Sequence, residues 1–271
     1  MNGWQFSPGP FLVAGPCLAE EGDLLPRVAG TLAEIGERLG LRICLKASFD
    51  KANRSRSTSP RGPGLERGLA LLALARKESG LPVLTDVHEP GQAQAAAEVA
   101  DALQVPAFLC RQTDLLVACG RTGKPVNLKK GQWMAPEDMA GAVEKVRQGG
   151  GNRSDVAVTE RGTFFGYGDL VVDLRSIARL RAATGVPVLF DATHAVQRPG
   201  RGTERTTGGN RDAIPPLLGA AAAAGVDGFY LETHPDPGRA PSDPETQWPL
   251  DQLEALMART LRIWRAAREG E

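Results

Sequence analysis

The chain has 271 residues, of which 42% are hydrophobic and 24% charged, and its 32 Lys plus Arg balance 32 Asp plus Glu. Zero net charge gives no overall field to attract nucleic acid or an anionic membrane surface, so an anionic ligand must be bound by local charge. Apolar runs are shorter than the roughly 20 residues of a membrane span, and no Lys or Arg precedes Arg27 to open a secretory signal, so we expect a cytoplasmic protein without a transmembrane helix.

Eight short runs of β-forming residues follow one another along the chain, each closed by polar or charged residues. In chain order they are residues 11–17, 41–49, 82–88, 102–107, 125–130, 155–161, 187–194 and 228–234. Patterns rich in Ala, Leu, Glu and Arg predict helices between and after them, such as residues 65–78, 92–99, 136–148, 170–183 and 250–268. No sequence repeat or low-complexity linker divides the chain. We therefore expect one α/β domain over residues 1–271, a single (β/α)8 barrel, with a doubly wound open sheet as the alternative.

The strand ends carry the candidate chemistry, because the active site of a (β/α)8 barrel forms where the strands run out. One such residue could simply mark a strand that meets water, but all eight runs end this way, and all three histidines, including His88 and His234, lie at such ends. The residues concerned are Cys17, Lys46, Asp86, Gln104, Lys129, Arg161, His194 and Glu232. Together they predict a common site at one end of the barrel.

One chemical group is cationic. Its members are Lys46, Lys51, Arg54, Lys129 and Arg161, joined by Arg111 after the fourth run. Cations gathered at one mouth repel each other unless they bind anions, so we expect phosphate or carboxylate ligands. The loop 51–64, KANRSRSTSPRGPG, adds serine hydroxyls and is typical of a phosphate-binding loop, although a solvated basic loop is the alternative. Its spacing is not that of a Walker motif, so no nucleotide is implied.

A second group, Cys17, His194, Glu232 and Asp243, offers a thiolate, an imidazole and two carboxylates. These are ligands that a borderline divalent transition ion prefers, and the cysteine argues against magnesium or calcium. A small buried thiol is the other interpretation of Cys17. His88 and His234 are nearby, and we expect them to support the ligands rather than to join them.

Several long motifs match one enzyme family. They include KASFDKANRS (46–55), RGPGLE (61–66), TDVHEP (85–90), PAFLCRQTDLL (106–116) and DATHAVQ (191–197). NLKKGQ (127–132), TERGTFFGYGDLVVD (159–173) and LETHPDP (231–237) continue in order. On these residues the chain resembles the 3-deoxy-D-manno-octulosonate 8-phosphate synthases, also called 2-dehydro-3-deoxyphosphooctonate aldolases. The resemblance covers nearly the whole chain.

The resemblance implies a homotetrameric (β/α)8 transferase that condenses phosphoenolpyruvate with D-arabinose 5-phosphate and water for lipopolysaccharide synthesis. It implies catalytic roles for Lys51, Lys129, His194 and Asp243. By the same motifs, Lys46, Lys129, Arg161 and His194 would surround phosphoenolpyruvate, with Lys51 between the substrates. Asn53, Arg54 and Ser55 would hold the sugar phosphate, Asp86 and Gln104 would lie near its hydroxyls, and Arg111 would reach it from a neighbouring subunit.

The resemblance also bears on the metal. Metal-independent members of this family carry Asn where this chain has Cys17, whereas metal-dependent members carry Cys. We therefore expect zinc, iron, manganese or cobalt at Cys17, His194, Glu232 and Asp243. Two departures stand out: Arg56 replaces a serine of the family's KANRSS pattern, and the lid expected at residues 198–211 matches the family in position alone.

Three other functions stay open. The related 3-deoxy-D-arabino-heptulosonate 7-phosphate synthases act on erythrose 4-phosphate, but their loop typically has KPRTS where this chain has KANRS. A Schiff-base aldolase would use Lys46 or Lys129 as the nucleophile. A phosphate-binding barrel without catalysis is the third.

Overall fold

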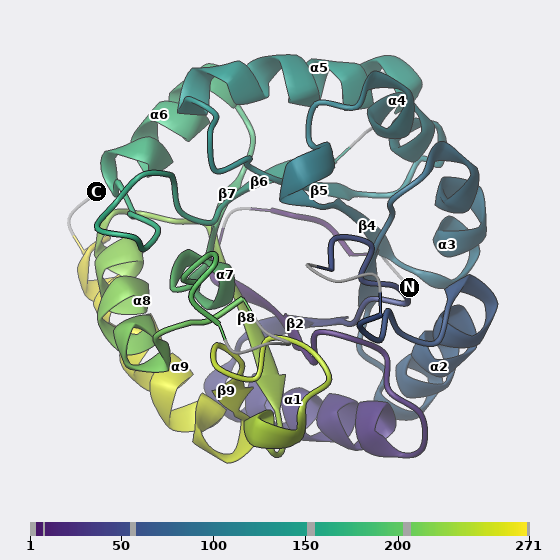
Figure 1. Ribbon diagram of the computed structural model, residues 1–271. Helices are drawn as coiled ribbons and strands as arrows, with labels where there is room; N and C mark the ends of the chain where they lie inside the picture. Colours follow the sequence, from purple (N-terminus) through teal and green to yellow (C-terminus); the bar gives the residue numbers. More distant parts are fainter. Residues whose placement is uncertain (1–3, 8, 55–57, 151–154, 203–206, 270–271) are drawn as a thin grey trace.

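A computed structural model describes residues 4–7, 9–54, 58–150, 155–202 and 207–269. Eight parallel strands pair in chain order, and β1 pairs with β8 to close the sheet (Figure 1). The strands are β1 (Phe11–Gly15), β2 (Arg42–Lys46), β3 (Val83–Asp86), β4 (Ala102–Val105), β5 (Val126–Lys129), β6 (Val156–Glu160), β7 (Val188–Asp191) and β8 (Gly228–His234). This closure confirms the predicted barrel and rules out the open sheet, since an open sheet has two unpaired edges.

The helices form a ring around the strands (Figure 1). They are α1 (Leu24–Leu39), α2 (Leu65–Ser79), α3 (Ala93–Val99), α4 (Thr113–Arg121), α5 (Met139–Gly150), α6 (Arg175–Thr184), α8 (Ile214–Ala223) and α9 (Leu253–Ala266). The helix expected over residues 170–183 begins later, at Arg175, because Val171 instead forms an antiparallel bridge with Thr163. Within the described residues no helix is long and apolar enough to cross a membrane.

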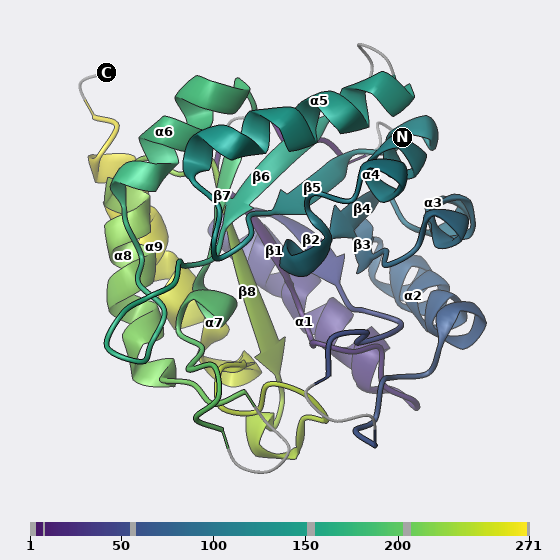
Figure 2. The same ribbon diagram turned by 45° about the horizontal axis from the view of Figure 1, so that its top comes forward.

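The core has two layers, because successive side chains of a strand face opposite sides of the sheet. The larger layer lies between strands and helices, whereas a smaller one fills the barrel. Aromatic side chains dominate the second: Phe11 packs edge-on against Trp4, and Phe6 lies beside both. These rings close the end of the barrel where the strands begin. A ligand must therefore enter at the other end, toward which β8 runs in Figure 2.

All the strands except β8 end one to three residues earlier than the sequence predicts, and the early ends of β1 and β7 place site residues. β1 stops at Gly15, where a Cβ would collide with the carbonyl oxygen of Lys46, so the close approach requires glycine. Cys17 lies two residues beyond, in the segment that crosses the mouth. β7 stops at Asp191 rather than at His194, because the Asp191 carboxylate accepts a hydrogen bond from the backbone N–H of His194 at 2.9 Å. That bond caps the short helix α7 (Ala192–Ala195), so His194 lies on a helical turn.

Candidate functional site

A cavity of about 430 Å³ opens at the carboxyl ends of the strands. The predicted site residues that line it are Cys17, Lys46, Lys51, Asn53, Arg54, Asp86, Gln104, Lys129, Arg161, His194, Glu232 and Asp243. Of the two remaining predicted site residues, Ser55 lies outside the described residues, as does Arg56. The exposed Arg111 borders a separate groove of about 110 Å³ with Lys145.

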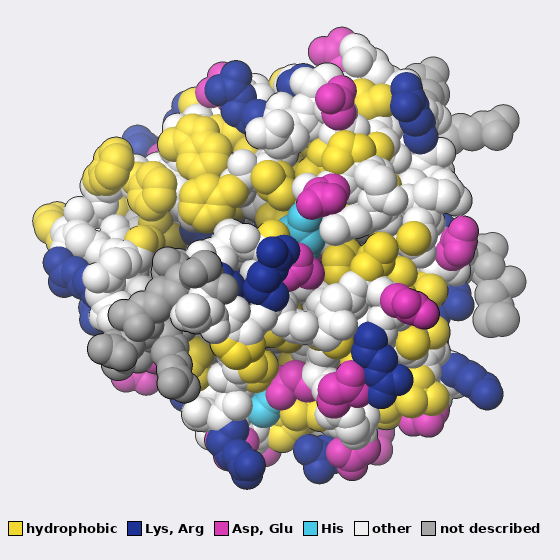
Figure 3. Space-filling view, turned by 45° about the vertical axis from the view of Figure 1, so that its right-hand side comes forward, with side chains coloured by type: hydrophobic (Ala, Val, Ile, Leu, Met, Phe, Trp, Pro, Cys, Tyr) yellow, Lys and Arg dark blue, Asp and Glu magenta, His cyan; other side chains and the backbone are white. Residues whose placement is uncertain are grey.

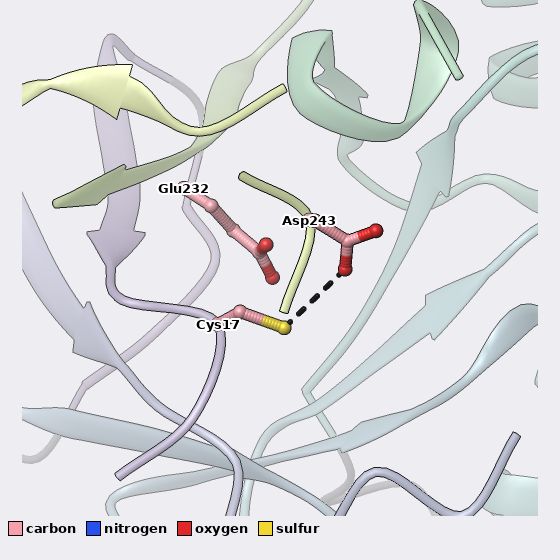
Figure 4. A group of neighbouring side chains, drawn as sticks. All are labelled: Cys17, Glu232 and Asp243. Atoms are coloured by element: carbon pink, nitrogen blue, oxygen red, sulfur yellow. Dashed lines mark hydrogen bonds between the residues drawn. The ribbon is translucent and has the colours of Figure 1, made fainter. Parts of the chain in front are cut away.

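Three of the four predicted metal ligands meet at one side of this cavity. One ligand atom each of Cys17, Glu232 and Asp243 lies within 4.8 Å of the other two (Figure 4). The Cys17 thiol donates to Asp243 Oδ2 at 3.5 Å. Glu232 Oε2 is buried without a hydrogen-bond partner in the described part of the chain. A thiol, two carboxylates and an unpaired buried oxygen fit a divalent transition ion.

The fourth predicted ligand, His194, lies beside this group and not within it. Its Nε2 is 3.9 Å from Glu232 Oε1. Its Nδ1 lies 2.7 Å from Asp191 Oδ2, so the ionised carboxylate places the ring proton on Nδ1 and leaves Nε2 as an acceptor. Asp191 is fully buried, and burial raises its pKa, but His194 and Lys129 outweigh burial and lower it.

Asp243 is held in an uncommon backbone conformation, with φ of 48°. Its carboxylate contacts the ammonium of Lys51, which also lies 3.2 Å from Cys17 Sγ. Burial raises the pKa of Asp243, but Lys51 and His194 outweigh it and lower the pKa. The Cys17 thiol has the opposite shift, since burial and the charge of Glu232 raise its pKa to about 12.

Two buried lysines lie near the ring of Tyr230. Lys46 Nζ donates to Glu232 Oε1 at 2.9 Å, whereas Lys129 Nζ donates to Asp191 Oδ2 at 2.6 Å and lies 3.0 Å from the Tyr230 ring centroid. Burial lowers the pKa of Lys46, but the Glu232 carboxylate, together with the weaker effects of Tyr230, Asp86 and Cys17, outweighs burial and holds the pKa well above the usual range. For Lys129, burial lowers the pKa more than the Asp191 carboxylate raises it, and the pKa falls to about 8. The two ammonium groups therefore differ in how readily they lose their proton.

Arg161 supplies a third cation, and it is 5% exposed. Its Nη2 donates to Gln197 Oε1 at 2.7 Å, and Gln197 Nε2 donates in turn to Asp243 Oδ1 at 3.0 Å. Its Nη1 is buried and has no partner among the described residues. Burial lowers the pKa of Arg161, which nevertheless stays charged because a guanidinium is so strongly basic. A buried cationic donor without a partner at a cavity wall is suited to an anionic ligand.

The loop after β2 brings the remaining cation. Arg54 donates from Nε to the Pro60 carbonyl at 2.7 Å and from Nη2 to the Pro241 carbonyl at 3.0 Å. It thereby connects the basic loop with the loop that carries Asp243. Asn53 also lines the cavity. The residues that would complete the phosphate loop, Ser55 and Ser57, lie outside the described part of the chain.

The two other histidines differ. His88 lines the cavity, with Nδ1 buried and unpaired within the described chain. His234 does not line it. Its Nδ1 accepts from the Asp236 N–H at 2.9 Å, and its Nε2 faces Glu20 at 3.2 Å, so it ties the loop after β1 to β8.

The sequence did not single out Gln197 and Tyr230 as site residues, and it marked Asp191 only as a polar end of the seventh run. For Tyr230 a signal existed, because it stands two residues before Glu232 on the same strand and so shares its face. Asp191 likewise ends β7. Gln197 follows α7 without a strand to place it, so no periodicity pointed to it.

Comparison with known proteins identifies the family of this chain. Residues 8–263 match the model of the DAHP synthetase I family. The 2-dehydro-3-deoxyphosphooctonate aldolase of Nitratidesulfovibrio vulgaris strain DP4 is 55% identical over 94% of this chain and 92% of its own length. Proteins of the same name from Syntrophotalea carbinolica and Dechloromonas aromatica are 52% and 50% identical, over 93% and 95% of this chain and 90% and 92% of their own lengths. The chain therefore belongs to the DAHP synthetase I family, together with the 2-dehydro-3-deoxyphosphooctonate aldolases.

Proposed function

We propose that the protein is a transferase that condenses phosphoenolpyruvate with D-arabinose 5-phosphate and water, releasing 3-deoxy-D-manno-octulosonate 8-phosphate and phosphate. The observation that carries the proposal is the unpaired, buried Nη1 of Arg161 at a cavity that also receives the ammonium groups of Lys46 and Lys129. Three cations that line one cavity suit a small substrate that carries both a carboxylate and a phosphate. The names of the relatives support the choice of substrates.

Two anionic substrates must lie close together for this reaction, so positioning and charge neutralisation supply most of the acceleration. Lys46, Lys129, Arg161 and His194 hold phosphoenolpyruvate. Asn53, Arg54 and Ser55 hold the phosphate of the sugar, while Asp86 and Gln104 meet its hydroxyls. Lys51 stands between the two sites, as its contacts with Cys17 and Asp243 support.

In the chemical step, C3 of phosphoenolpyruvate bonds to the aldehyde carbon, a water oxygen bonds to C2, and the bond from C2 to the phosphate oxygen breaks. The Lys51 ammonium donates a proton to the aldehyde oxygen as it becomes an alcohol. The Asp243 carboxylate, which is ionised because Lys51 and His194 lower its pKa, accepts one proton of the water, and the departing phosphate takes the second as the C2 carbonyl forms. A zinc, iron, manganese or cobalt ion held by Cys17, His194, Glu232 and Asp243 supplies, when bound, a Lewis acid for the aldehyde or for the water.

The assembly we propose is a homotetramer in the cytoplasm, serving lipopolysaccharide synthesis. Apolar side chains gather on one side of the face in Figure 3. Exposed aromatic residues include Phe108, which stacks on Trp133 with ring centroids 5.7 Å apart, and Phe165 and Tyr167, which are 94% and 99% exposed. Such a surface suits contact with another subunit. Arg111, three residues after Phe108, would reach the neighbour's sugar phosphate from there.

The experiment that tests this function is a steady-state assay of phosphate release from phosphoenolpyruvate with each aldose phosphate. We expect turnover with arabinose 5-phosphate to exceed turnover with erythrose 4-phosphate greatly. Equal or reversed rates would assign the chain to the heptulosonate synthases of the same family. If no aldose phosphate is turned over, the remaining interpretation is a phosphate-binding barrel without catalysis.

A Schiff-base aldolase is the second candidate, favoured by the lowered pKa of Lys129. Its Nζ is hydrogen-bonded to Asp191 at 2.6 Å, however, which opposes release of the proton. Borohydride added during turnover distinguishes the two mechanisms. Covalent trapping of substrate carbon on Lys129 would favour the Schiff base, whereas unchanged protein mass supports the condensation without an imine.

A further inference from the structure

A continuous row of hydrogen-bonded polar side chains crosses the inside of the barrel. Thr159 Oγ1 on β6 donates to Asn127 Oδ1 on β5 at 2.7 Å, and Asn127 Nδ2 donates to Gln104 Oε1 on β4 at 2.8 Å. Gln104 Nε2 then donates to Asp86 Oδ1 on β3 at 2.7 Å. The Ser48 hydroxyl, from the loop after β2, donates to the other oxygen of Asp86. Each link joins neighbouring strands, so the row follows the curve of the sheet.

The direction of the row is fixed from its Asp86 end. Lys46 Nζ lies 3.5 Å from Asp86 Oδ2. Burial raises the pKa of Asp86, but Lys46 and His88 outweigh burial and lower it, so the carboxylate is ionised and can only accept. Gln104 must therefore turn its amide nitrogen toward Asp86 and its carbonyl toward Asn127. A reversed Gln104 side chain would place its carbonyl oxygen against the Asp86 carboxylate, so that two acceptors would face each other, and its amide nitrogen against that of Asn127.

The other end of the row is fixed by Thr159, whose hydroxyl can donate to the Asn127 carbonyl. Asn127 and Thr159 are both 0% exposed and do not line the cavity, whereas Gln104 and Asp86 do. The layer beneath them is apolar, with Leu84, Ala102 and Ala157 from the same strands. Burying an amide and a hydroxyl here costs free energy unless every group is paired, and a fully paired network holds a single arrangement.

Two side chains of the row, Gln104 and Asp86, line the cavity and can contact a substrate. Gln104 keeps one amide hydrogen that is not used by Asp86, so it can offer a donor to a ligand in the cavity. Asp86 offers only lone pairs. A donor and an acceptor held side by side recognise a hydroxyl group in one position, and they reject a sugar whose hydroxyl points elsewhere.

We propose that Asn127 and Thr159 are positioning residues, which fix the atoms that Gln104 and Asp86 present to the aldose hydroxyls and thereby set selectivity among aldose phosphates. This inference rests on the proposed function of the same site. It assigns specificity to two residues that touch no substrate. Their effect should appear in the constants for the sugar and not in those for phosphoenolpyruvate.

The test uses Thr159→Val, which keeps the shape of the side chain and removes the hydroxyl. Asn127 Oδ1 is then buried without a donor, and the row loses one anchor. We expect KM for arabinose 5-phosphate to rise roughly 3- to 10-fold, the loss typical of one neutral hydrogen bond. KM for phosphoenolpyruvate should stay at the wild-type value. The ratio of kcat/KM for arabinose 5-phosphate to that for its 2-epimer, ribose 5-phosphate, should fall.

Three further variants make the result interpretable. Thr159→Ser keeps the hydroxyl and should restore wild-type constants. Thr260→Val removes a hydroxyl on α9 that is also buried and donates to the Leu256 carbonyl at 2.9 Å, and it should change neither KM nor selectivity. Asn127→Asp keeps the shape but offers Gln104 no donor, so it should reproduce the Thr159→Val pattern if that variant fails to fold.

Two outcomes would overturn the proposal. The first is wild-type KM and epimer ratio in folded Thr159→Val or Asn127→Asp. The second is an equal loss of kcat/KM for both epimers that Thr159→Ser does not restore, since that pattern indicates a structural role alone. Failure of the proposed function looks different, because the wild-type enzyme itself would then not turn over arabinose 5-phosphate.

Discussion

At the scale of single residues, Asp191 organises more of the site than its position in the sequence suggests. Its buried carboxylate accepts from the backbone and ring of His194 and from Lys129 Nζ. One side chain thus orients a candidate metal ligand and a candidate phosphoenolpyruvate contact. A candidate metal ligand and a candidate anion-binding cation are therefore linked through the same carboxylate.

Cys17→Ala tests the metal assignment at this scale. We expect the metal content per chain, measured by elemental analysis after dialysis against a limiting transition ion, to fall about tenfold or more, because even groups that merely orient ligands contribute that much to affinity. A chelator should abolish the activity of the wild-type protein, and zinc, manganese, iron or cobalt should restore it.

Cys119→Ala is the matched control for Cys17→Ala. Cys119 is equally a free, buried thiol, but it lies on α4 away from the cavity, so its loss should leave metal content unchanged. Full metal content in Cys17→Ala would contradict the assignment. Cys17→Asn asks in addition whether the pocket can work without the ion, as the family resemblance implies for members with Asn at this position.

Lys129 predicts a pH dependence. Its pKa is lowered to about 8, so the free enzyme carries this ammonium below that pH and loses it above. The kcat/KM for phosphoenolpyruvate, which reports groups of the free enzyme, should therefore decline as pH rises through about 8. Lys129→Arg, if active, should lack the decline because a guanidinium stays charged. A wild-type profile that is flat from about pH 7 to about pH 9 would exclude the role.

At the scale of elements, the contact between α4 and α5 depends on glycine. Added Cβ atoms at Gly120 and Gly149 would collide with the carbonyl oxygens of Val146 and Val117 on the facing helix. The two backbones therefore approach more closely than any larger residue permits. This contact supports the barrel wall next to β5, the strand that carries Lys129.

Gly120→Ala should lower the free energy of unfolding by about 1–3 kcal/mol, because the added methyl group has no space between the helices. Gly141→Ala provides the control: Gly141 lies on the same helix pair, is exposed, and would place its Cβ in open space. There alanine should stabilise the protein by about 0.5–1 kcal/mol through helix propensity. Thermal or urea unfolding measures both, and equal shifts would show that the close approach is unimportant.

At the scale of the whole molecule, a barrel plugged by aromatic rings at one end leaves one mouth for chemistry, and that mouth carries exposed aromatic residues at its rim. The exposed Arg111 does not reach the cavity of its own chain. Both observations agree with the proposed homotetramer in which subunits complete each other's sites.

Mixing variants tests this sharing. Arg111→Ala and Arg161→Ala chains, each inactive alone, should regain activity when they are denatured and refolded together, because about a quarter of the sites in random assemblies then combine an intact Arg161 with a neighbour's intact Arg111. Mixing Arg111→Ala with the double variant should restore nothing. Heterotetramers no more active than the separate variants would contradict sharing.

The sequence by itself determined the barrel, because alternating strand and helix patterns in about 250 residues leave few other architectures. It also determined most of the site, since polar side chains at the ends of parallel strands must gather at one edge. Cys17, Lys46, Asp86, Gln104, Lys129 and Glu232 line the cavity for this reason.

Only the tertiary structure decided how these residues are paired. The contact of Gln197 with Arg161 and Asp243, and the place of His194 beside the Cys17, Glu232 and Asp243 group, depend on loops whose paths have no periodic signature in the sequence. The row from Thr159 to Asp86 is of the same kind. Its direction follows from which donor meets which acceptor across four strands, and these hydrogen bonds between residues distant in the chain exist only once β3 to β6 have paired.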